Sequence, residues 1–219
     1  MIKLPYKRVV LMVWISCLSN TVIFAKSFQT GDIIFHTSKS SQSIVIQKAT
    51  VSPYSHMGMI VYRNGKPWVL EAIQPVKYTP LDAWTKRGVN QYYVVKRYHK
   101  NLNAEQQVRL VKSAEKHLGK NYDLYFGWGD DAIYCSEIVW KAYDQALGIQ
   151  LAPLQKLRQF DLTDSKVKAL MQTRYGNKVP LNETVIAPNA IYNSKQLITI
   201  KRIRHWVFIP IPSEYFSKL

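Results

Sequence analysis

The 219-residue chain contains only two cysteines, Cys17 and Cys135. It also lacks the HExxH and CxxC patterns of common metal sites, a P-loop and a dinucleotide-binding fingerprint. These absences predict that the protein uses no metal and no cofactor. Internal repeats and low-complexity tracts are absent as well, and 47% of the residues are hydrophobic. The composition therefore predicts an ordered, globular protein.

Acidic residues are scarce, with 14 Asp and Glu against 30 Lys and Arg and a net charge of +16. Without residues 1–25, which hold three basic and no acidic residues, the net charge is +13. Such a charge is typical of a basic, soluble surface or of one attracted to anionic envelope material, such as cell-wall polymers or lipid head groups. The sequence contains no nucleic-acid-binding motif, so nucleic acid is not an expected partner. The sequence leaves the oligomeric state open.

The N-terminus has no hydrophobic run long enough to span a bilayer comfortably. Three basic residues precede an apolar run at 9–15, and no acidic residue occurs before Asp32. This pattern predicts a signal peptide over 1–25, cleaved after Ala25, and a single exported, periplasmic domain over 26–219. A lipoprotein anchored through Cys17 is a second possibility, but Trp14 stands where a lipobox has Leu. If residues 1–25 are removed, Cys135 is the only cysteine and no intramolecular disulfide can form.

The predicted helices and strands do not alternate strictly, which favours an α+β fold with an antiparallel sheet. Strands are predicted at 31–38, 52–73 (a hairpin), 90–98 and 198–210. Helices are predicted at 40–50, 81–88, 162–176, 103–120 and from Asp130 or Asp131 to 147, the last two separated by an aromatic loop. The 103–120 helix is capped by Asn103 and ended by Gly119, with an apolar face of Val108, Val111, Ala114 and Leu118; Gly148 closes the helix that contains Cys135.

The hairpin places two polar residues beside each other. Asn64-Gly65 predicts a two-residue turn, so that paired residues have numbers adding to 129. His56 and Glu71 then lie on one face as diagonal neighbours, and Gly58 opposite Glu71 leaves space above the strand. Such a carboxylate can orient an imidazole and stabilise its protonated form. Each residue could also have only a local role, His56 as a strand-edge histidine and Glu71 as a solvated side chain.

Cys135 lies at the first turn of its predicted helix, on the side with Ile138, Val139, Ala142 and Ala146. A buried cysteine can be a purely structural apolar residue. At a helix N-terminus, however, free N–H groups and the positive dipole end stabilise a thiolate. Cys135, His56 and Glu71 together would supply the nucleophile, base and orienting carboxylate of a cysteine hydrolase.

The stretch LGKNYDLYFGWGDDAIYCSEIVWKAY resembles the cysteine segment of NlpC/P60-type papain-like hydrolases. In this chain GDIIF and YSHMG precede YCSE, so histidine comes before cysteine. That order, with the tail GNKVPLNETVIAPNAIYNS, resembles the circularly permuted YaeF/YiiX-like amidases, and the resemblance covers nearly the whole mature chain. The resemblance implies a permuted papain-like α+β fold, with an antiparallel sheet packed against the cysteine helix.

The resemblance also assigns roles to individual residues. It implies Cys135 as nucleophile, His56 as base and Glu71 as the third polar residue, where many relatives have His, Asn or Gln. The Cys135 backbone N–H is the implied main oxyanion donor. Tyr122, thirteen residues before Cys135, matches the tyrosine that assists the oxyanion in NlpC/P60 enzymes. Tyr134, next to Cys135, is a further candidate for the oxyanion or for substrate binding.

The sequence-based hypothesis is thus a cysteine amidase or peptidase that forms a thioester, with cell-wall peptides or their fragments as the expected substrates. The alternative within enzymes is a lipid amidase, esterase or acyltransferase that uses the same site. A non-catalytic, basic module that binds envelope polymers is a rival from another class. An apolar cleft, for which Trp84, Tyr125 and Trp128 are candidates, would favour lipid, whereas acidic groups placed for a free amine would favour peptide.

Overall fold

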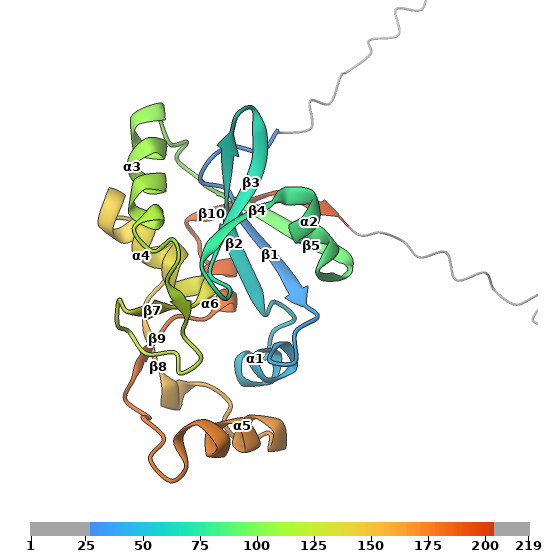
Figure 1. The fold of residues 1–219 in the computed structure, drawn as a ribbon, viewed down its shortest axis with the longest axis vertical. Helices are drawn as coiled ribbons and strands as arrows, with labels where there is room; N and C mark the ends of the chain where they lie inside the picture. The colour runs from blue at the N-terminus through green and yellow to red at the C-terminus, as the bar shows by residue number, and fades with distance from the viewer. Residues whose placement is uncertain (1–26, 204–219) are drawn as a thin grey trace, which may run out of the picture.

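A six-stranded antiparallel sheet forms the centre of the molecule (Figure 1). The computed structural model describes residues 27–203, so the predicted signal peptide, Cys17 and residues 204–210 of the last predicted strand lie outside the described residues. The strand order is β10-β5-β1-β2-β3-β4. The strands are β1 (Ile33–Ser38), β2 (His56–Arg63), β3 (Lys66–Glu71), β4 (Lys77–Pro80), β5 (Gly88–Tyr98) and β10 (Leu197–Ile203).

Helices cover both faces of this sheet. In Figure 1, α3 and α4 lie on one side of the strands and α2 lies on the other. Two short two-stranded sheets, β6–β7 and β8–β9, complete the fold. The remaining elements are α1 (Ser43–Thr50), α2 (Leu81–Lys86), α3 (Ala104–Glu115), α4 (Cys135–Leu147), α5 (Ser165–Tyr175), α6 (Pro188–Tyr192), the 3-10 helix η1 (Leu157–Gln159), β6 (Asn121–Tyr122), β7 (Ala132–Ile133), β8 (Gln155–Lys156) and β9 (Thr184–Val185).

The hairpin of β2 and β3 has the predicted register. Arg63 pairs with Lys66 across the Asn64-Gly65 turn, and each further pair adds to the same number. Both turn residues have positive φ, 49° and 72°, as a turn of this hand requires. The α+β class and the antiparallel sheet are confirmed.

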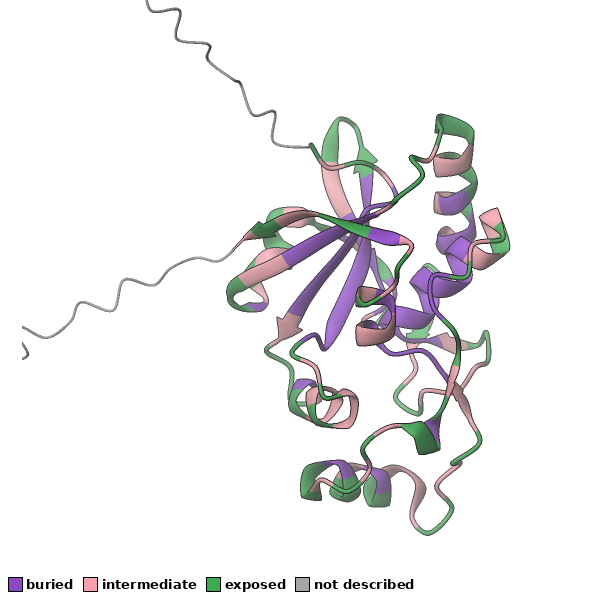
Figure 2. Ribbon diagram, turned by 180° about the vertical axis from the view of Figure 1, so that it is seen from behind, coloured by how far each residue is buried: buried purple, intermediate pink, exposed green. Residues whose placement is uncertain are grey.

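Each face of the sheet has its own apolar core, as the alternation of strand residues requires. The larger core joins Met57, Met59 and Leu70 of the hairpin to α4 and includes Cys135. The smaller core, on the other face, consists of Ile34, Ile60, Val69, Trp84 and Val95, and α2 contributes its tryptophan. Figure 2 shows the central strands as mostly buried.

The segment from β8 to β9 lies at one end of the molecule, with α5 the element farthest from the hairpin tip (Figures 1 and 2). Helix α5 packs against α1. Its side chains are mostly exposed or half-buried, apart from Val167 and Met171. This segment is therefore held to the rest of the fold mainly through α1 and its own apolar side chains.

Several helix boundaries differ from the prediction, and those of α3 and α4 differ most. Helix α3 begins after Asn103, whose side chain accepts a hydrogen bond from the Gln106 backbone, but it ends at Glu115 rather than near Gly119. Its buried face also differs: α3 packs against α4 with Leu110 and Ala114 buried, whereas Val108 and Leu118 are exposed.

Helix α4 begins at Cys135, and neither Asp130 nor Asp131 caps it. The Asp130 carboxylate is instead paired with Lys141, and residues 132–133 are held in a short parallel strand beside β6. The predicted end at Gly148 is confirmed, where the backbone is left-handed. Within residues 27–203, no helix is long and apolar enough to cross a membrane.

Candidate active site

Cys135, His56 and Glu71 meet at the end of the sheet. His56 is the first residue of β2, Glu71 is the last of β3, and Cys135 is the first of α4. The His56 Nε2 atom lies 2.6 Å from Glu71 Oε2, and the side chains of His56 and Cys135 are within hydrogen-bonding reach. Because Nε2 is occupied by Glu71, Nδ1 is the ring nitrogen left for the thiol. The structure thus brings together the three residues selected from the sequence.

The Glu71 carboxylate is fully buried and accepts hydrogen bonds on both oxygens. In addition to His56, Oε2 accepts from the Trp84 indole N–H at 2.8 Å. Oε1 accepts from the Thr79 hydroxyl at 2.6 Å and forms an ion pair with Arg87. These donors fix the carboxylate and compensate for its loss of hydration.

The environment favours a charged pair between His56 and Glu71. Burial alone would raise the pKa of Glu71, but the His56 bond and charge, with Arg87 and Thr79, hold that pKa below its ordinary value. Burial alone would lower the pKa of His56, yet its bonds to Cys135 and Glu71 raise it to about 9. The imidazolium form is therefore stable at neutral pH, which suits a group that must return a proton to a leaving amine.

The backbone around Cys135 can stabilise an oxyanion. The first bond of the helix runs from Ile138 N–H to the Tyr134 carbonyl, so the N–H groups of Cys135 to Glu137 have no acceptor within α4. The Tyr122 side chain is within hydrogen-bonding reach of Cys135. Burial, followed by the electrostatic effect of Cys135, raises the pKa of Tyr122, so its hydroxyl stays protonated. Tyr122 is thus placed where the resemblance puts it.

Tyr134 has a different environment from Tyr122. Its hydroxyl accepts a hydrogen bond from the Ile186 backbone N–H at 3.0 Å, and its ring packs edge-on against Phe126. The neighbouring Ser136 hydroxyl donates to the Ile186 carbonyl at 2.7 Å. Tyr134 and Ser136 therefore fasten the segment after β9 to the start of α4, and the Tyr134 ring forms part of a pocket wall.

An apolar pocket of about 60 Å³ lies on one side of Cys135. Its walls come from α1, from the segment between η1 and α5, and from the residues around β9. None of the described residues that line it is charged. Its lining includes Val45, Ala49, Phe160, Leu170, Met171 and Ala187. The predicted cleft residues do not line it: Trp84 is buried behind Glu71, Tyr125 packs on Tyr175, and Trp128 packs on Trp140.

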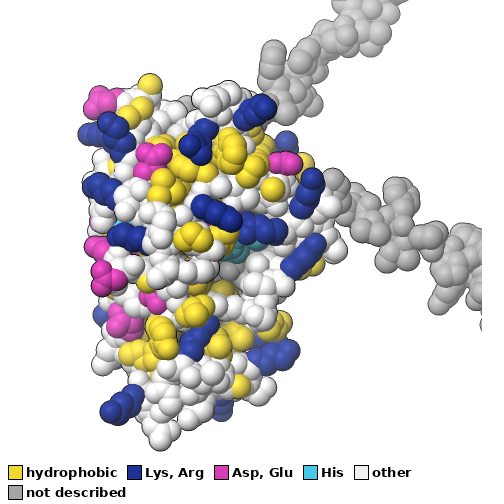
Figure 3. All heavy atoms as spheres, in the orientation of Figure 1, with side chains coloured by type: hydrophobic (Ala, Val, Ile, Leu, Met, Phe, Trp, Pro, Cys, Tyr) yellow, Lys and Arg dark blue, Asp and Glu magenta, His cyan; other side chains and the backbone are white. Residues whose placement is uncertain are grey.

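A second, polar cleft of about 650 Å³ lies on the His56 side. It is lined by the end of β1, the loop before α1 and the end of α2. Tyr122 and Ile46 line both the pocket and the cleft, so the two spaces adjoin at these residues. Figure 3 shows a histidine side chain at the bottom of a hollow with Lys and Arg side chains around it.

His36, near the end of β1, could be either a polar strand-end residue or a neighbour of the site by sequence, and the structure places it in the lining of the cleft. It pairs with His56 across β1 and β2, and its ring stacks on Trp84 with a centroid separation of 3.9 Å. Burial, together with the charges of His56 and Arg87, lowers the pKa of His36 to about 2. His36 is therefore neutral at neutral pH, and of the two described histidines that line the cleft only His56 is positively charged.

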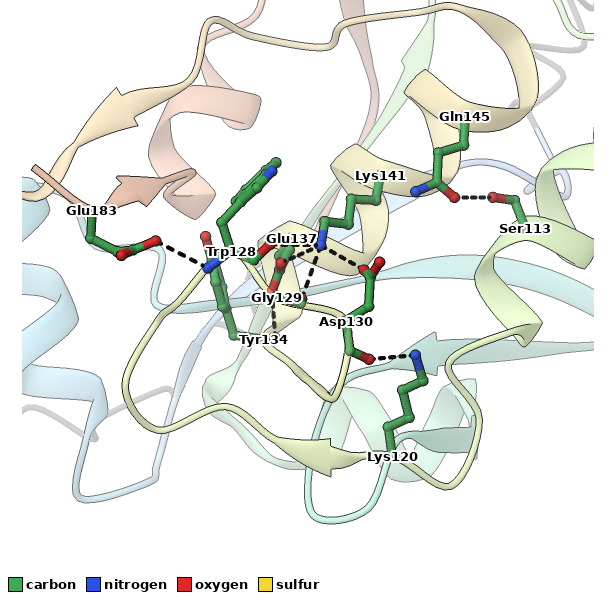
Figure 4. Close-up of polar contacts among 10 residues, drawn as sticks. All are labelled: Ser113, Lys120, Trp128, Gly129, Asp130, Tyr134, Glu137, Lys141, Gln145 and Glu183. Carbon is green, nitrogen blue, oxygen red and sulfur yellow. Dashed lines mark hydrogen bonds and ion pairs between the residues drawn. The ribbon is translucent and has the colours of Figure 1, made fainter.

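A second charge cluster, with Glu137 and Lys141 of α4 buried and Asp130 of the preceding loop exposed, lies near Cys135 (Figure 4). Lys141 pairs with Glu137 and with Asp130, each at 2.8 Å, and donates to the Gly129 carbonyl at 3.0 Å. Glu137 also accepts from the Tyr134 backbone N–H at 3.3 Å. Lys141 thereby ties the loop between β6 and β7 to α4 and helps to hold the N-terminal turn that contains Cys135.

Comparison with known proteins relates this geometry to a family. The family model described as permuted papain-like amidase enzyme, YaeF/YiiX, C92 family, matches residues 27–201. The uncharacterised protein YiiX of Escherichia coli (strain K12) is 50% identical over 188 residues, which cover 86% of this chain and 93% of YiiX. The crystal structure of metalloprotein YiiX from Escherichia coli O157:H7 matches with a TM-score of 0.79 and 51% identity, over 81% of this chain and 98% of that chain.

These matches confirm the resemblance that the order of YSHMG and YCSE indicated, and they confirm the permuted papain-like fold. The family model covers the whole span from β1 into β10, which includes Cys135, His56 and Glu71. The chain belongs to the YaeF/YiiX family of permuted papain-like amidases.

Proposed function

We propose that this amidase cleaves the amide bond between an apolar acyl group and a polar amine, through a thioester on Cys135. The observation that supports this most directly is that Cys135 lines the apolar pocket, whereas its partner His56 lines the adjoining polar cleft. An acyl chain in the pocket and an amine in the cleft would bring the amide carbon next to the sulfur. This corresponds to the lipid-directed alternative rather than to the cell-wall peptide that sequence analysis placed first.

In the first half of the reaction, the proton of Cys135 resides on His56 Nδ1, as the raised pKa of His56 favours, and the thiolate sulfur attacks the amide carbon. Glu71, bonded to Nε2, keeps the imidazole oriented and stabilises its positive charge. The tetrahedral intermediate places negative charge on the former carbonyl oxygen. The Cys135 N–H at the start of α4 and the Tyr122 hydroxyl would donate hydrogen bonds to that oxygen.

When the intermediate collapses, the C–N bond breaks and His56 gives its proton to the departing nitrogen. The amine leaves through the cleft, and the acyl group stays on sulfur as a thioester. In the second half, His56 takes a proton from a water molecule, which attacks the thioester carbon. The C–S bond then breaks, the acid is released, and the Cys135 thiolate is left beside protonated His56, as at the start.

The cleft lining argues for an acyl amide over a cell-wall peptide. A peptide substrate with a free amine would be bound by an acidic group. None of the described residues that line the cleft is Asp or Glu. The pocket, in contrast, offers only apolar surface and two small polar residues, Thr50 and Ser136. Burial of each methylene of an acyl chain there is worth about 0.8 kcal/mol.

A bound metal does not fit the residues of this site. The relative of known structure is described as a metalloprotein. Over residues 27–203, however, no group of three or more His, Cys, Asp or Glu converges as metal ligands would. Both oxygens of Glu71 are already engaged by hydrogen-bond donors and by Arg87. No step of the reaction above is assigned to a metal.

Action at the cell envelope is part of the same proposal. The signal-peptide pattern of residues 1–25 and the net charge of +13 of the remaining chain support it. Fractionation of cells that express the full chain tests it: processed protein is expected in the periplasm. Unprocessed protein in the cytosol would contradict export without affecting the chemistry.

The substrate assignment is tested with N-acyl amines of increasing acyl length. Purified protein is expected to hydrolyse hexanoyl amides faster than acetyl amides, with kcat/KM rising about fourfold for each methylene that enters the pocket. Ala49→Leu, which fills the pocket, is expected to abolish this preference and leave acetyl turnover unchanged. Ala83→Leu on the exposed face of α2 is the matched control. Faster hydrolysis of muropeptides than of any acyl amide would overturn the assignment and favour the cell-wall peptide.

A further inference from the structure

The polar cleft beside His56 is strongly one-sided in charge. Among the described residues that line it, Lys39, Lys86 and Arg87 are basic and none is acidic. Lys39 comes from the loop after β1, whereas Lys86 and Arg87 end α2. The Lys39 ammonium donates to the Lys86 carbonyl at 3.2 Å, which draws the two segments together at the rim. The charges therefore come from two separate elements and converge on one space.

Acidic partners do not neutralise this group within the cleft. Arg87 uses one guanidinium nitrogen for Glu71, and that carboxylate is shared with His56. Among the described residues, the acidic partner of Lys86 is Asp82, one turn back on α2, with 3.7 Å between the charged atoms and both side chains well exposed. A solvated pair of this kind is worth little. Lys39 and Lys86 are thus available to a ligand.

Hydrogen-bond donors without an acceptor also support a negatively charged ligand in the cleft. The Arg87 Nε and the Gln42 Nε2 are buried without an acceptor among the described residues. Gln42 lies on the loop before α1 and, like Arg87, lines the cleft. A buried donor without a partner is costly unless a ligand or water supplies an acceptor. A negatively charged ligand supplies acceptors and charge together.

We infer that the cleft is an anion-binding subsite, in which Lys39 and Lys86 hold a carboxylate or phosphate on the amine side of the scissile bond. The preferred substrates are then N-acylated amines that carry a negative charge close to the nitrogen, of which N-acyl amino acids are the simplest. This inference rests on the proposed function, because it assigns the cleft to the leaving amine. Arg87 adds its charge to the subsite but is held mainly by Glu71.

The geometry explains why a charge at this place would favour the reaction. An anion held by Lys39 and Lys86 positions the amide over Cys135 from one side, while the acyl chain positions it from the other. The attraction acts equally on the bound substrate and on the transition state. The effect of Lys39 and Lys86 is therefore expected mainly in KM, and it should weaken as salt screens the exposed lysines.

The test compares two substrates that differ only in charge, N-hexanoylglycine and N-hexanoylglycinamide. The wild-type protein is expected to favour the carboxylate by about tenfold in kcat/KM at low salt. The double variant Lys39→Gln/Lys86→Gln is expected to lose most of that preference, because kcat/KM falls much more for the carboxylate than for the neutral amide. Lys112→Gln, an exposed residue of α3 far along the chain from the cleft, is the matched control. N-hexanoyl phosphoethanolamine, compared with N-hexanoylethanolamine, repeats the test for phosphate.

Binding to Cys135→Ala protein gives a second readout that does not depend on turnover. Tighter binding of N-hexanoylglycine than of its amide, lost in the lysine double variant, is the expected result. Equal affinities for the two compounds, or a preference that survives the double substitution, would overturn the anion subsite. If the preference in binding is seen but neither compound is hydrolysed by wild-type protein, the subsite stands and the proposed hydrolysis fails.

Discussion

Two glutamates, Glu71 and Glu137, are completely buried in this protein. Their environments shift the carboxyl pKa in opposite directions. Glu71 accepts from His56, Trp84 and Thr79 and pairs with Arg87, and its pKa lies below the ordinary value. Burial raises the pKa of Glu137 to about 7, because Lys141 and one backbone N–H only partly compensate for it. Burial alone therefore does not set the charge of a carboxylate; the number and charge of its donors do.

The comparison also distinguishes a carboxylate that contacts the reacting groups from one that only stabilises the fold around them. Glu71 lies against the imidazole that faces Cys135, whereas Glu137 lies in the first turn of α4 and pairs with Lys141. The two residues have the same burial and the same side chain. Substitutions at the two positions therefore form a matched pair, and their effects should differ in kind.

The largest effect is expected for Glu71→Gln. The amide keeps the volume and can still accept from Trp84 or Thr79, but it cannot balance the charge of protonated His56. We expect kcat to fall roughly 100-fold or more, with little change in KM. Steady-state kinetics on an acyl amide measures this, and Glu137→Gln serves as the control, with less than a threefold change expected. Similar losses in both variants would show that Glu71 has no special role.

The next effect is expected for Gly58→Ala, on the strand that faces Glu71. A methyl group there would lie 2.4 Å from Val69 Cγ1 and 2.9 Å from the Leu70 carbonyl, so β3 would have to move. We expect a loss of about 1–3 kcal/mol in the free energy of unfolding, and reduced activity because Glu71 moves with β3. Urea denaturation measures the first quantity. Gly129→Ala, with no heavy atom within 4 Å of the added methyl, should be nearly neutral.

A smaller effect concerns pH. The pKa of His56 is raised in the folded protein from 6.5 to about 9, so the folded state binds more protons than the unfolded state between these values. The stabilisation by protonated His56 is thus complete below pH 6.5 and lost as the pH rises through about 9. We expect the advantage of wild-type protein over His56→Gln in thermal unfolding to shrink across that range. An advantage that stays constant with pH would contradict the raised pKa.

The smallest effect is expected for the stability of Glu137→Gln. Here the variant, not the wild-type protein, is expected to gain in relative stability as the pH rises. Because the pKa of Glu137 rises from 4.5 to about 7 on folding, the wild-type protein loses stability as the pH rises from 4.5 to 7. Gln cannot ionise, so the variant should gain relative to the wild type over this range. Thermal unfolding at pH 5 and pH 8 measures the change. A relative loss for the variant at pH 8 would mean that the Lys141 pair outweighs burial.

Local patterns were enough to predict one half of the site. The register of β2 and β3 follows from Asn64-Gly65, so the proximity of His56 and Glu71 could be predicted from the sequence. Residues that reach the site from elsewhere in the chain could not. Trp84, Thr79 and Arg87 contact Glu71 only because β4 and α2 fold back over the sheet, and no local spacing signals this.

The helix that contains Cys135 shows the same limit. Asp130 and Asp131 are good capping residues by sequence. The Asp130 carboxylate, however, binds Lys141, eleven residues later in the chain, and does not cap the helix. The apolar pocket is formed by α1, η1, α5 and β9, segments far apart in the chain. The tail around Val185 to Pro188 was noted for its resemblance alone, and the structure adds that it forms a wall beside Cys135.

The account depends most on Cys135 as the residue that takes the acyl group. Its most direct test is mass spectrometry of protein quenched in acid during turnover of an N-hexanoyl amine. A mass increase equal to one hexanoyl group on the peptide that contains Cys135, absent from Cys135→Ala, is the predicted result. Continued turnover by Cys135→Ala, or an acyl group on another residue, would contradict it.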